Sequence, residues 1–105
     1  VENVAASEIE SVIMLSGVVD ECAVVGQKHY MLDEVPVVFI IPGPGASELT
    51  HAQLEETLIA HCRKNLPDFK VVRSVHVVDE LPRSTLEKIA KNVLRDRLPP
   101  ITSDN

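Results

Sequence analysis

The residues best suited to bind an anion lie in the stretch LPRSTLEKIAKNVLR, residues 81–95. Residues 83–97 hold five of the ten lysine and arginine residues, although the net charge of the chain is −6. Lys88 follows a short loop that begins at Pro82, so its ammonium is placed to act as a point charge. A basic segment on an acidic chain indicates an anionic partner. A surface helix with a solvated basic side has the same pattern, and charge and spacing alone leave both interpretations open.

Other stretches are weaker candidates for chemistry. PGPGASE, residues 42–48, lies where a phosphate-binding loop would lie, but it lacks the Gly-Lys-Ser/Thr ending. We interpret it as a connector. The four histidines show no spacing typical of metal ligands, so we predict no metal site. Cys22 and Cys62 are 40 positions apart in apolar segments, which predicts two buried, reduced thiols.

The chain alternates between helical patterns and strand patterns. Residues 7–17 and 49–67 have apolar residues at helical spacing. Residues 18–26, 34–42 and 70–78 are short runs rich in β-branched residues, which predict strands. With a last helix near residue 85, the order is helix, strand, strand, helix, strand, helix. We therefore predict a small α+β domain, with a sheet of about three strands and helices packed on it.

Two of the predicted helices have start signals. Thr50 and Gln53 fit a capping box, and so do Ser84 and Glu87, which would start the last helix at Thr85. The expected buried stripe of the first of these helices is Leu54, Leu58, Cys62 and Leu66. The expected buried face of the last helix is Leu86, Ile89, Ala90 and Val93, opposite Lys88, Lys91 and Arg95.

Length and composition narrow the class of protein. A chain of 105 residues forms one domain and is too short for two. The acidic balance argues against nucleic-acid binding. No apolar run reaches the ~20 residues that span a bilayer, and no signal peptide is recognisable, so we expect a cytoplasmic protein. The chain does not begin with Met, which suggests a piece of a longer polypeptide.

Four collinear motifs resemble the acyl-adenylate-forming superfamily, which includes acyl-CoA synthetases, adenylation domains and luciferases. PRSTLEKI is similar to its signature Pro-[Lys/Arg]-Thr-x-x-Gly-Lys-[Ile/Val]. ENVAASEIESVI, GVVDECAVVG and DEVPVVFII resemble three further segments, in the same order and spacing. The resemblance runs from Glu2 to Arg95. The ENV start and the KIAKNVL run look like carnitine-type or fatty-acyl-CoA ligases.

The resemblance implies that residues 1–98 are the C-terminal lid domain of an AMP-forming acyl-CoA synthetase, with residues 99–105 as a flexible tail. The large N-terminal domain that binds ATP, Mg²⁺ and the acyl group would be the lid's partner. In such enzymes a carboxylate first reacts with ATP to give an acyl-adenylate. The lid then rotates, and the thiol of CoA takes the acyl group. The isolated chain is expected to be inactive.

The resemblance also implies roles for single residues. Lys88 falls on the catalytic lysine of the adenylation step. The turn around Asn3 and Val4 would line the pantetheine channel, Gly26 would bring backbone near the nucleotide end of CoA, and Arg63 would approach a CoA phosphate. A solvated helix end explains Arg63 equally well. Glu87 stands where the family has Gly, which places a carboxylate beside the ammonium of Lys88.

Two alternatives stay open at this point. The chain could belong to an adenylation domain that loads the thiol of a carrier protein instead of CoA. It could also be a non-catalytic α+β interaction module, since capped helices and an acidic front need no reactive residue.

Overall fold

The fold is described here from a computed structural model, in which residues 3–86 and 88–103 are described. The helices and strands occur in the predicted order: α1 (Asn3–Met14), β1 (Val19–His29), β2 (Asp33–Pro42), α2 (His51–Asn65), β3 (Val75–Val77) and α3 (Lys91–Asp96). Short 3-10 turns, η1 (Pro44–Ala46) and η2 (Asp68–Lys70), flank α2. In this part of the chain, no helix has both the length and the apolar character needed to cross a membrane.

The sheet has three strands in the order β1-β2-β3, which confirms the predicted α+β class. β1 and β2 are antiparallel, with Val24 opposite Val38, and β3 runs parallel to β2, with Val75 opposite Val38. β3 is shorter than the predicted strand over residues 70–78. Backbone hydrogen bonds continue on both sides of it, from Arg73 to Pro36 (2.8 Å) and from Val78 to Ile40 (2.9 Å).

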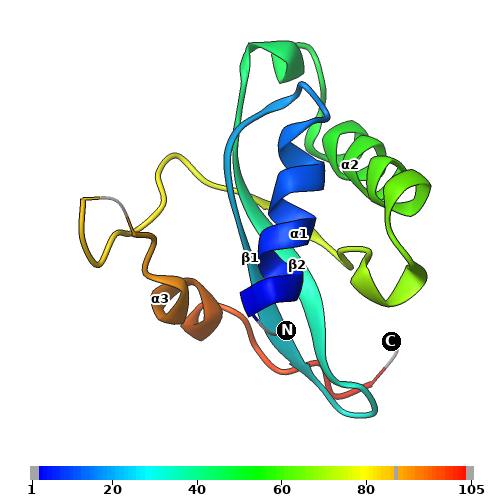
Figure 1. Cartoon of the computed structure of the whole chain (residues 1–105), viewed down its shortest axis with the longest axis vertical. Helices are drawn as coiled ribbons and strands as arrows, with labels where there is room; N and C mark the ends of the chain where they lie inside the picture. The colour runs from blue at the N-terminus through cyan, green and yellow to red at the C-terminus, as the bar shows by residue number, and fades with distance from the viewer. Residues whose placement is uncertain (1–2, 87, 104–105) are drawn as a thin grey trace.

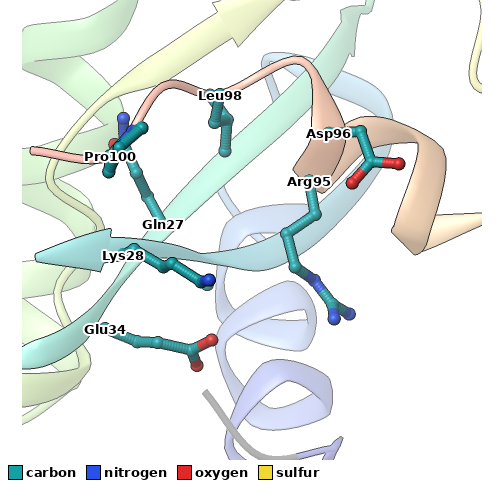
Figure 2. Close-up of a pocket in the computed structure, with 8 residues that line it drawn as sticks. Gln27, Lys28, Glu34, Arg95, Asp96, Leu98 and Pro100 are labelled. Atoms are coloured by element: carbon teal, nitrogen blue, oxygen red, sulfur yellow. The ribbon is translucent and has the colours of Figure 1, made fainter.

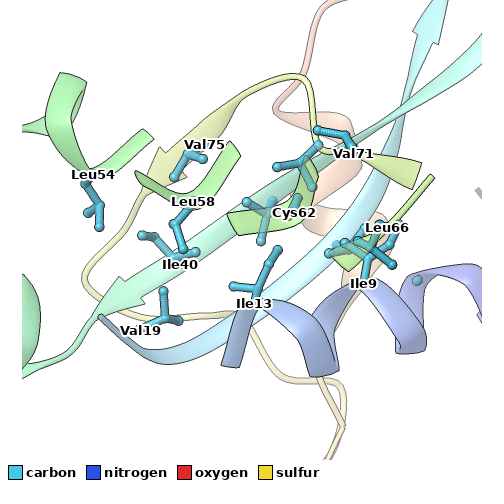
Figure 3. Close-up of a cluster of buried hydrophobic side chains, with 14 of the residues drawn as sticks. Ile9, Ile13, Val19, Ile40, Leu54, Leu58, Cys62, Leu66, Val71 and Val75 are labelled. Carbon is cyan, nitrogen blue, oxygen red and sulfur yellow. The ribbon is translucent and has the colours of Figure 1, made fainter. Parts of the chain in front are cut away.

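Both faces of the sheet are covered. α1 and α2 pack on one face, where Ile9, Ile13 and Leu58 are fully buried in the same core as Ile40 (Figures 1 and 3). On the other face residues 81–86 and 88–98 cover the sheet, and Leu81 and Leu94 are the side chains from these residues that are buried in the second core. β2 contributes side chains to both layers, Val38 and Ile40 to the first and Val37 and Phe39 to the second, which is consistent with its uninterrupted apolar sequence.

α2 begins as predicted. The Gln53 amide donates to Thr50 Oγ1 (3.1 Å), and the Thr50 amide donates to Gln53 Oε1 (3.0 Å), which completes the capping box. The four residues of the predicted stripe are all buried: Leu54, Leu58, Cys62 and Leu66. Local start signals and apolar spacing therefore agree with tertiary packing in this helix.

The predicted start of the last helix is wrong. α3 begins at Lys91 and has six residues, whereas residues 83–86 and 88–89 belong to a hairpin closed by a bridge between Arg83 and Ile89. Glu87, the expected capping partner, lies outside the described residues. The Ser84 amide donates forward to the Lys88 carbonyl (2.9 Å), which is opposite to the direction of a helical bond. Pairing and packing of the hairpin thus override the local capping signal.

The buried face predicted for that helix is only partly correct. Leu86 is 98% exposed and Val93 is 39% exposed, whereas Ala90 is buried as expected and Leu94 is completely buried. The shifted helix start turns Leu94, instead of Val93, toward the sheet. Leu94 is the side chain of this short helix that packs into the second core, which is formed with β1 and β2.

The segment after α3 contacts β1 at its open edge. The Ile101 amide donates to the Lys28 carbonyl (2.8 Å), and the Ile101 carbonyl accepts from the Tyr30 amide (2.9 Å). Gln27 Nε2 donates to the Pro99 carbonyl (2.8 Å). These contacts fall inside the predicted tail over residues 99–105, whose flexibility stays a prediction.

The two cores give a direct stability prediction. Leu58→Ala removes a fully buried side chain, so we expect unfolding of the 105-residue chain to become easier by about 2–5 kcal/mol. Leu86→Ala is the matched control, because the same atoms are removed from a side chain that is 98% exposed. Urea unfolding measures both. A loss for Leu86→Ala as large as that for Leu58→Ala would contradict the described packing.

Candidate functional site

Lys88 directly precedes Ile89, at the closing bridge of the hairpin, and its side chain is exposed. Its backbone is held in place, because its carbonyl accepts from the Ser84 amide (2.9 Å) and the Ser84 hydroxyl (3.4 Å), and its amide donates to the Thr85 carbonyl (3.3 Å). Within residues 3–86 and 88–103, its ammonium has no ion-pair partner. A fixed backbone with an unpaired charge suits an anion supplied from outside this domain.

Two basic side chains near the hairpin, Arg83 and Lys91, are paired to carboxylates. Arg83 pairs with Glu21 of β1, and Lys91 Nζ lies 2.8 Å from Glu10 Oε2 of α1. The same Glu10 oxygen accepts from the Val24 amide (2.8 Å). Glu10 therefore joins α1, β1 and α3, and Arg83 ties the base of the hairpin to the sheet. These two pairs distinguish Lys88 from Arg83 and Lys91.

A second candidate is a cavity of about 300 Å³ at the open edge of β1. Its lining residues come from β1, β2, α3 and the segment that follows: Gly26, Gln27, Lys28, Glu34, Arg95, Asp96, Leu98 and Pro100. Figure 2 shows the charged ends of Lys28, Glu34 and Arg95 gathered on one side of β1, with Leu98 and Pro100 on the other. The cavity thus offers two cationic side chains and two carboxylates.

Gly26 is the predicted site residue in this cavity. It is buried, and a Cβ at this position would lie 2.5 Å from Glu34 Oε1 and 2.7 Å from Glu34 Cδ. The Val24 amide and the Lys28 carbonyl point away from β2, so by alternation the backbone of Gly26 faces the same open edge. The absence of a side chain leaves room here for the Glu34 carboxylate.

Arg63 lies elsewhere. It is exposed in the last turn of α2 and lines a groove of about 390 Å³ with Ile59, Asp68, Val71, Val72 and Arg73. Since α2 covers the face of the sheet opposite to residues 81–98, Arg63 and Lys88 are on different sides of the domain (Figure 1). A second guanidinium, that of Arg73, shares this groove.

Asn3 and Val4 begin α1, where the resemblance had implied a turn. The helix starts four residues earlier than the predicted stretch over residues 7–17, so both positions have helical backbone. α1 packs on the same face of the sheet as α2. The predicted site residues therefore do not form one cluster: Lys88 is on one side, and the positions of α1 and α2 are on the other.

Three basic residues near the predicted sites had not been singled out: Lys28, Arg73 and Arg95. A sequence signal exists only for Lys28, which is two positions after Gly26 and thus on the same side of a strand. Arg95 had been placed with Lys88 and Lys91 on the basic face of the predicted last helix, but not in a site. Arg73 reaches the groove of Arg63 because its amide bonds to Pro36 in β2, which no local pattern reveals.

The cysteines are unpaired thiols, and two of the histidines contact backbone carbonyls of the fold. Both thiols are free, and burial raises the pKa of Cys62. His51 Nε2 lies 2.9 Å from the Val75 carbonyl, and His61 Nε2 lies 2.7 Å from the Val12 carbonyl. Burial lowers the pKa of His76. No group of three His, Cys, Asp or Glu side chains in the described part of the chain is arranged to hold a metal ion.

Comparison with known proteins decides the family. Residues 8–88 match the family model described as the AMP-binding enzyme C-terminal domain. The chain belongs to this family. Probable acyl-activating enzyme 5, peroxisomal, of Arabidopsis thaliana is 37% identical over 95 residues, which cover 90% of this chain and 17% of that protein. The chain therefore spans about a sixth of the length of such relatives.

Solved structures agree with the family. An acyl-CoA synthetase from Brucella canis superimposes with a TM-score of 0.80 at 33% identity, covering 88% of this chain and 17% of that one. ATP-bound MatB from Rhodopseudomonas palustris gives a TM-score of 0.75 at 33% identity over the same shares of both chains. The fold of this chain is therefore that of the C-terminal domain of adenylate-forming enzymes, as the motifs predicted.

The environment of Cys22 predicts slow thiol chemistry. Burial, followed by the nearby Glu10 carboxylate, raises the pKa of Cys22 from 9.0 to about 12. At pH 8 the thiolate, which is the reactive form, should be scarce, so we expect iodoacetamide to alkylate Cys22 at least about tenfold more slowly than an unfolded control. Mass spectrometry of native and urea-unfolded chain measures this. Equal rates in the two states would contradict the described environment.

Proposed function

We propose that this chain is the lid domain of an AMP-forming acyl-CoA synthetase, in which Lys88 acts in the adenylation step. The observation that carries the proposal is the exposed ammonium of Lys88, unpaired within the described residues, on a hairpin whose backbone is fixed. The chain belongs to the family of C-terminal domains of AMP-binding enzymes, so we propose that the Lys88 ammonium acts in an adenylate-forming enzyme. This family membership also argues against a stand-alone interaction module.

The chemistry of the first step explains the need for a cation. A carboxylate oxygen bonds to the α-phosphorus of ATP, the bond to the β-phosphate bridging oxygen breaks, and pyrophosphate leaves. Negative charge from the carboxylate and the phosphoryl oxygens converges as the new bond forms. An ammonium that is delivered by the lid stabilises this charge more in the transition state than in the ground state.

ATP and its Mg²⁺ are proposed to be bound by the larger domain of the full polypeptide. In residues 3–86 and 88–103 no group of three His, Cys, Asp or Glu side chains is arranged to hold a metal ion, and Lys88 supplies a cation to the site. Mg²⁺ bound with ATP would neutralise phosphate charge. The part played by this chain is to bring Lys88 to the reacting oxygens and to exclude water from them.

The second step is proposed to use the other side of the domain. The thiol of CoA attacks the acyl carbon, the bond to the AMP oxygen breaks, and AMP leaves. Arg63 and the start of α1, with Asn3 and Val4, lie across the sheet from the hairpin, and Gly26 lies at the open edge. This separation supports a rotation of the lid between the two steps, because one orientation cannot present both surfaces to one active site.

The full polypeptide provides the test of this function. We expect carboxylate-dependent exchange between ATP and pyrophosphate, followed by acyl transfer when CoA is added. A scan over carboxylates of different chain length identifies the acyl group, and a carrier protein offered in place of CoA identifies the acceptor. No exchange with any carboxylate would contradict adenylation. The cytoplasmic location stays a prediction.

Lys88 gives the sharpest prediction for the first step. We expect Lys88→Ala in the full polypeptide to lower the rate of ATP–pyrophosphate exchange by about 10²–10³-fold, as for other lost donors of this kind. Thioester formation from supplied acyl-adenylate should change far less. Lys70→Ala is the control, since it removes the same charge from a lysine that is paired with Glu8. Equal losses of both half-reactions in Lys88→Ala would refute the assigned role.

Gly26 gives a prediction for the second step. The Cβ of Gly26→Ala would displace the Glu34 carboxylate, which is the far end of a flexible side chain. The displaced negative charge and the added methyl group crowd the cavity, and KM for CoA should rise roughly tenfold.

The control for this variant is Gly43→Ala, whose Cβ would lie 3.3 Å from the Asp20 amide nitrogen, away from the cavity. Its KM for CoA should stay at the wild-type value. Steady-state kinetics at saturating ATP and acyl substrate measure both variants. An unchanged KM for CoA in Gly26→Ala would remove this cavity from the proposed CoA path.

A further inference from the structure

A bulge in β1 directs Glu21 toward the hairpin that carries Lys88. The pairing of β1 with β2 shifts register between Val19 and Glu21, so Asp20 is an extra residue in the strand. Val19 is buried in the core under α1 and α2, on the same face as Val24. In a regular strand, residues 19 and 21 would share a face and residues 19 and 24 would not. The bulge reverses the alternation at this point.

The consequence of the bulge is the position of the Glu21 side chain. Beyond Asp20 the strand is regular, and Ala23 and Val25 face Leu81 and Leu94 in the second core. Glu21 shares this face by alternation. Bulges commonly re-aim a side chain in this way. The bulge therefore allows one strand to bury Val19 on the side of the helices and to present a carboxylate to residues 81–98.

The partner of Glu21 is at the base of the hairpin. Glu21 Oε1 accepts from Arg83 Nη2. Arg83 is bridged to Ile89, the residue directly after Lys88. The two partners are separated by 62 positions in the sequence, so their pairing joins the hairpin to a strand of the sheet. Their side chains are 38% and 40% exposed, so the pair adds little to global stability and acts mainly on the local orientation of the hairpin.

We propose that Glu21 is a positioning residue for the adenylation step. Through Arg83 it fixes the base of the hairpin and thereby the direction in which the Lys88 ammonium leaves the domain. The proposal rests on the proposed role of Lys88. Transition-state stabilisation by a point charge depends strongly on where that charge is, so a looser hairpin weakens the step without changing the groups that react.

The chain contains a matched control for this pair. Glu8 of α1 pairs with Lys70 of η2, and the Glu8 side chain is 48% exposed. This is another partly exposed carboxylate–cation contact between elements that are 62 positions apart, but neither partner belongs to the hairpin. Glu8→Gln and Glu21→Gln therefore make the same change of charge and remove the same kind of contact, and only the second reaches Lys88.

The experiment compares both half-reactions in the full polypeptide. We expect Glu21→Gln to lower kcat for ATP–pyrophosphate exchange about two- to fivefold, the range of an exposed ion pair, with KM for ATP and the rate of thioester formation from supplied acyl-adenylate unchanged. Glu8→Gln should leave all three values unchanged. Arg83→Gln approaches the same contact from the other side and should reproduce the effect. The double variant should be no slower than either single variant, since both act through one contact.

Hydrogen exchange gives a readout that does not depend on activity. The Ser84 amide bonds to the Lys88 carbonyl, so in Glu21→Gln we expect its exchange rate to rise several-fold, with no change in Glu8→Gln. Wild-type exchange at Ser84 and wild-type adenylation in Glu21→Gln would overturn the positioning role. Equal losses in Glu8→Gln and Glu21→Gln would overturn it too, because they would indicate a general effect of charge.

The outcome also separates this inference from the proposed function. If Lys88→Ala slows adenylation and Glu21→Gln leaves both adenylation and Ser84 exchange unchanged, the role of Lys88 stands and that of Glu21 falls. If Lys88→Ala leaves adenylation unchanged, the proposed function of Lys88 falls, and with it the reason to position the hairpin.

Discussion

The burial of β2 on both faces is the constraint on which the rest of the structure depends. Its side chains alternate between a core under α1 and α2 and a second core under residues 81–98. β2 is covered on both faces and therefore separates the two layers. Each layer exposes different polar side chains on its own side of the domain. Lys88 belongs to the second layer and Arg63 to the first. The two-sided arrangement thus follows from an uninterrupted apolar strand.

The second layer is built to hold a short hairpin instead of a helix. Leu81 and Leu94 are its buried anchors, and the chain between them has to leave the sheet and return. Backbone bonds from Ser84 and Thr85 to Lys88 close this excursion, and pairing of Arg83 with Glu21 ties it to β1. The result is an exposed ammonium on a restrained backbone. Such a group suits an active site that is completed by another domain.

Much of the fold was predictable because its signals are local. The capping box of α2, its buried stripe and the β-branched strands all agree with the packing, and the four collinear motifs led to the correct family. The last helix was not predictable, since Ser84 forms a hairpin bond where a cap was expected. The bulge at Asp20 and the Glu21–Arg83 pair have no local signal, because each depends on a partner strand or on a residue far away in the sequence.

Competitive labelling of lysines tests most directly whether Lys88 is the cation that the lid delivers. In the full polypeptide without ligand, we expect reductive methylation to be faster at Lys88 than at Lys91, which is paired with Glu10. A non-hydrolysable acyl-adenylate analogue should then slow the labelling of Lys88 strongly and leave that of Lys91 nearly unchanged. Labelling of Lys88 that is slow without the analogue, or unaffected by it, would contradict the account.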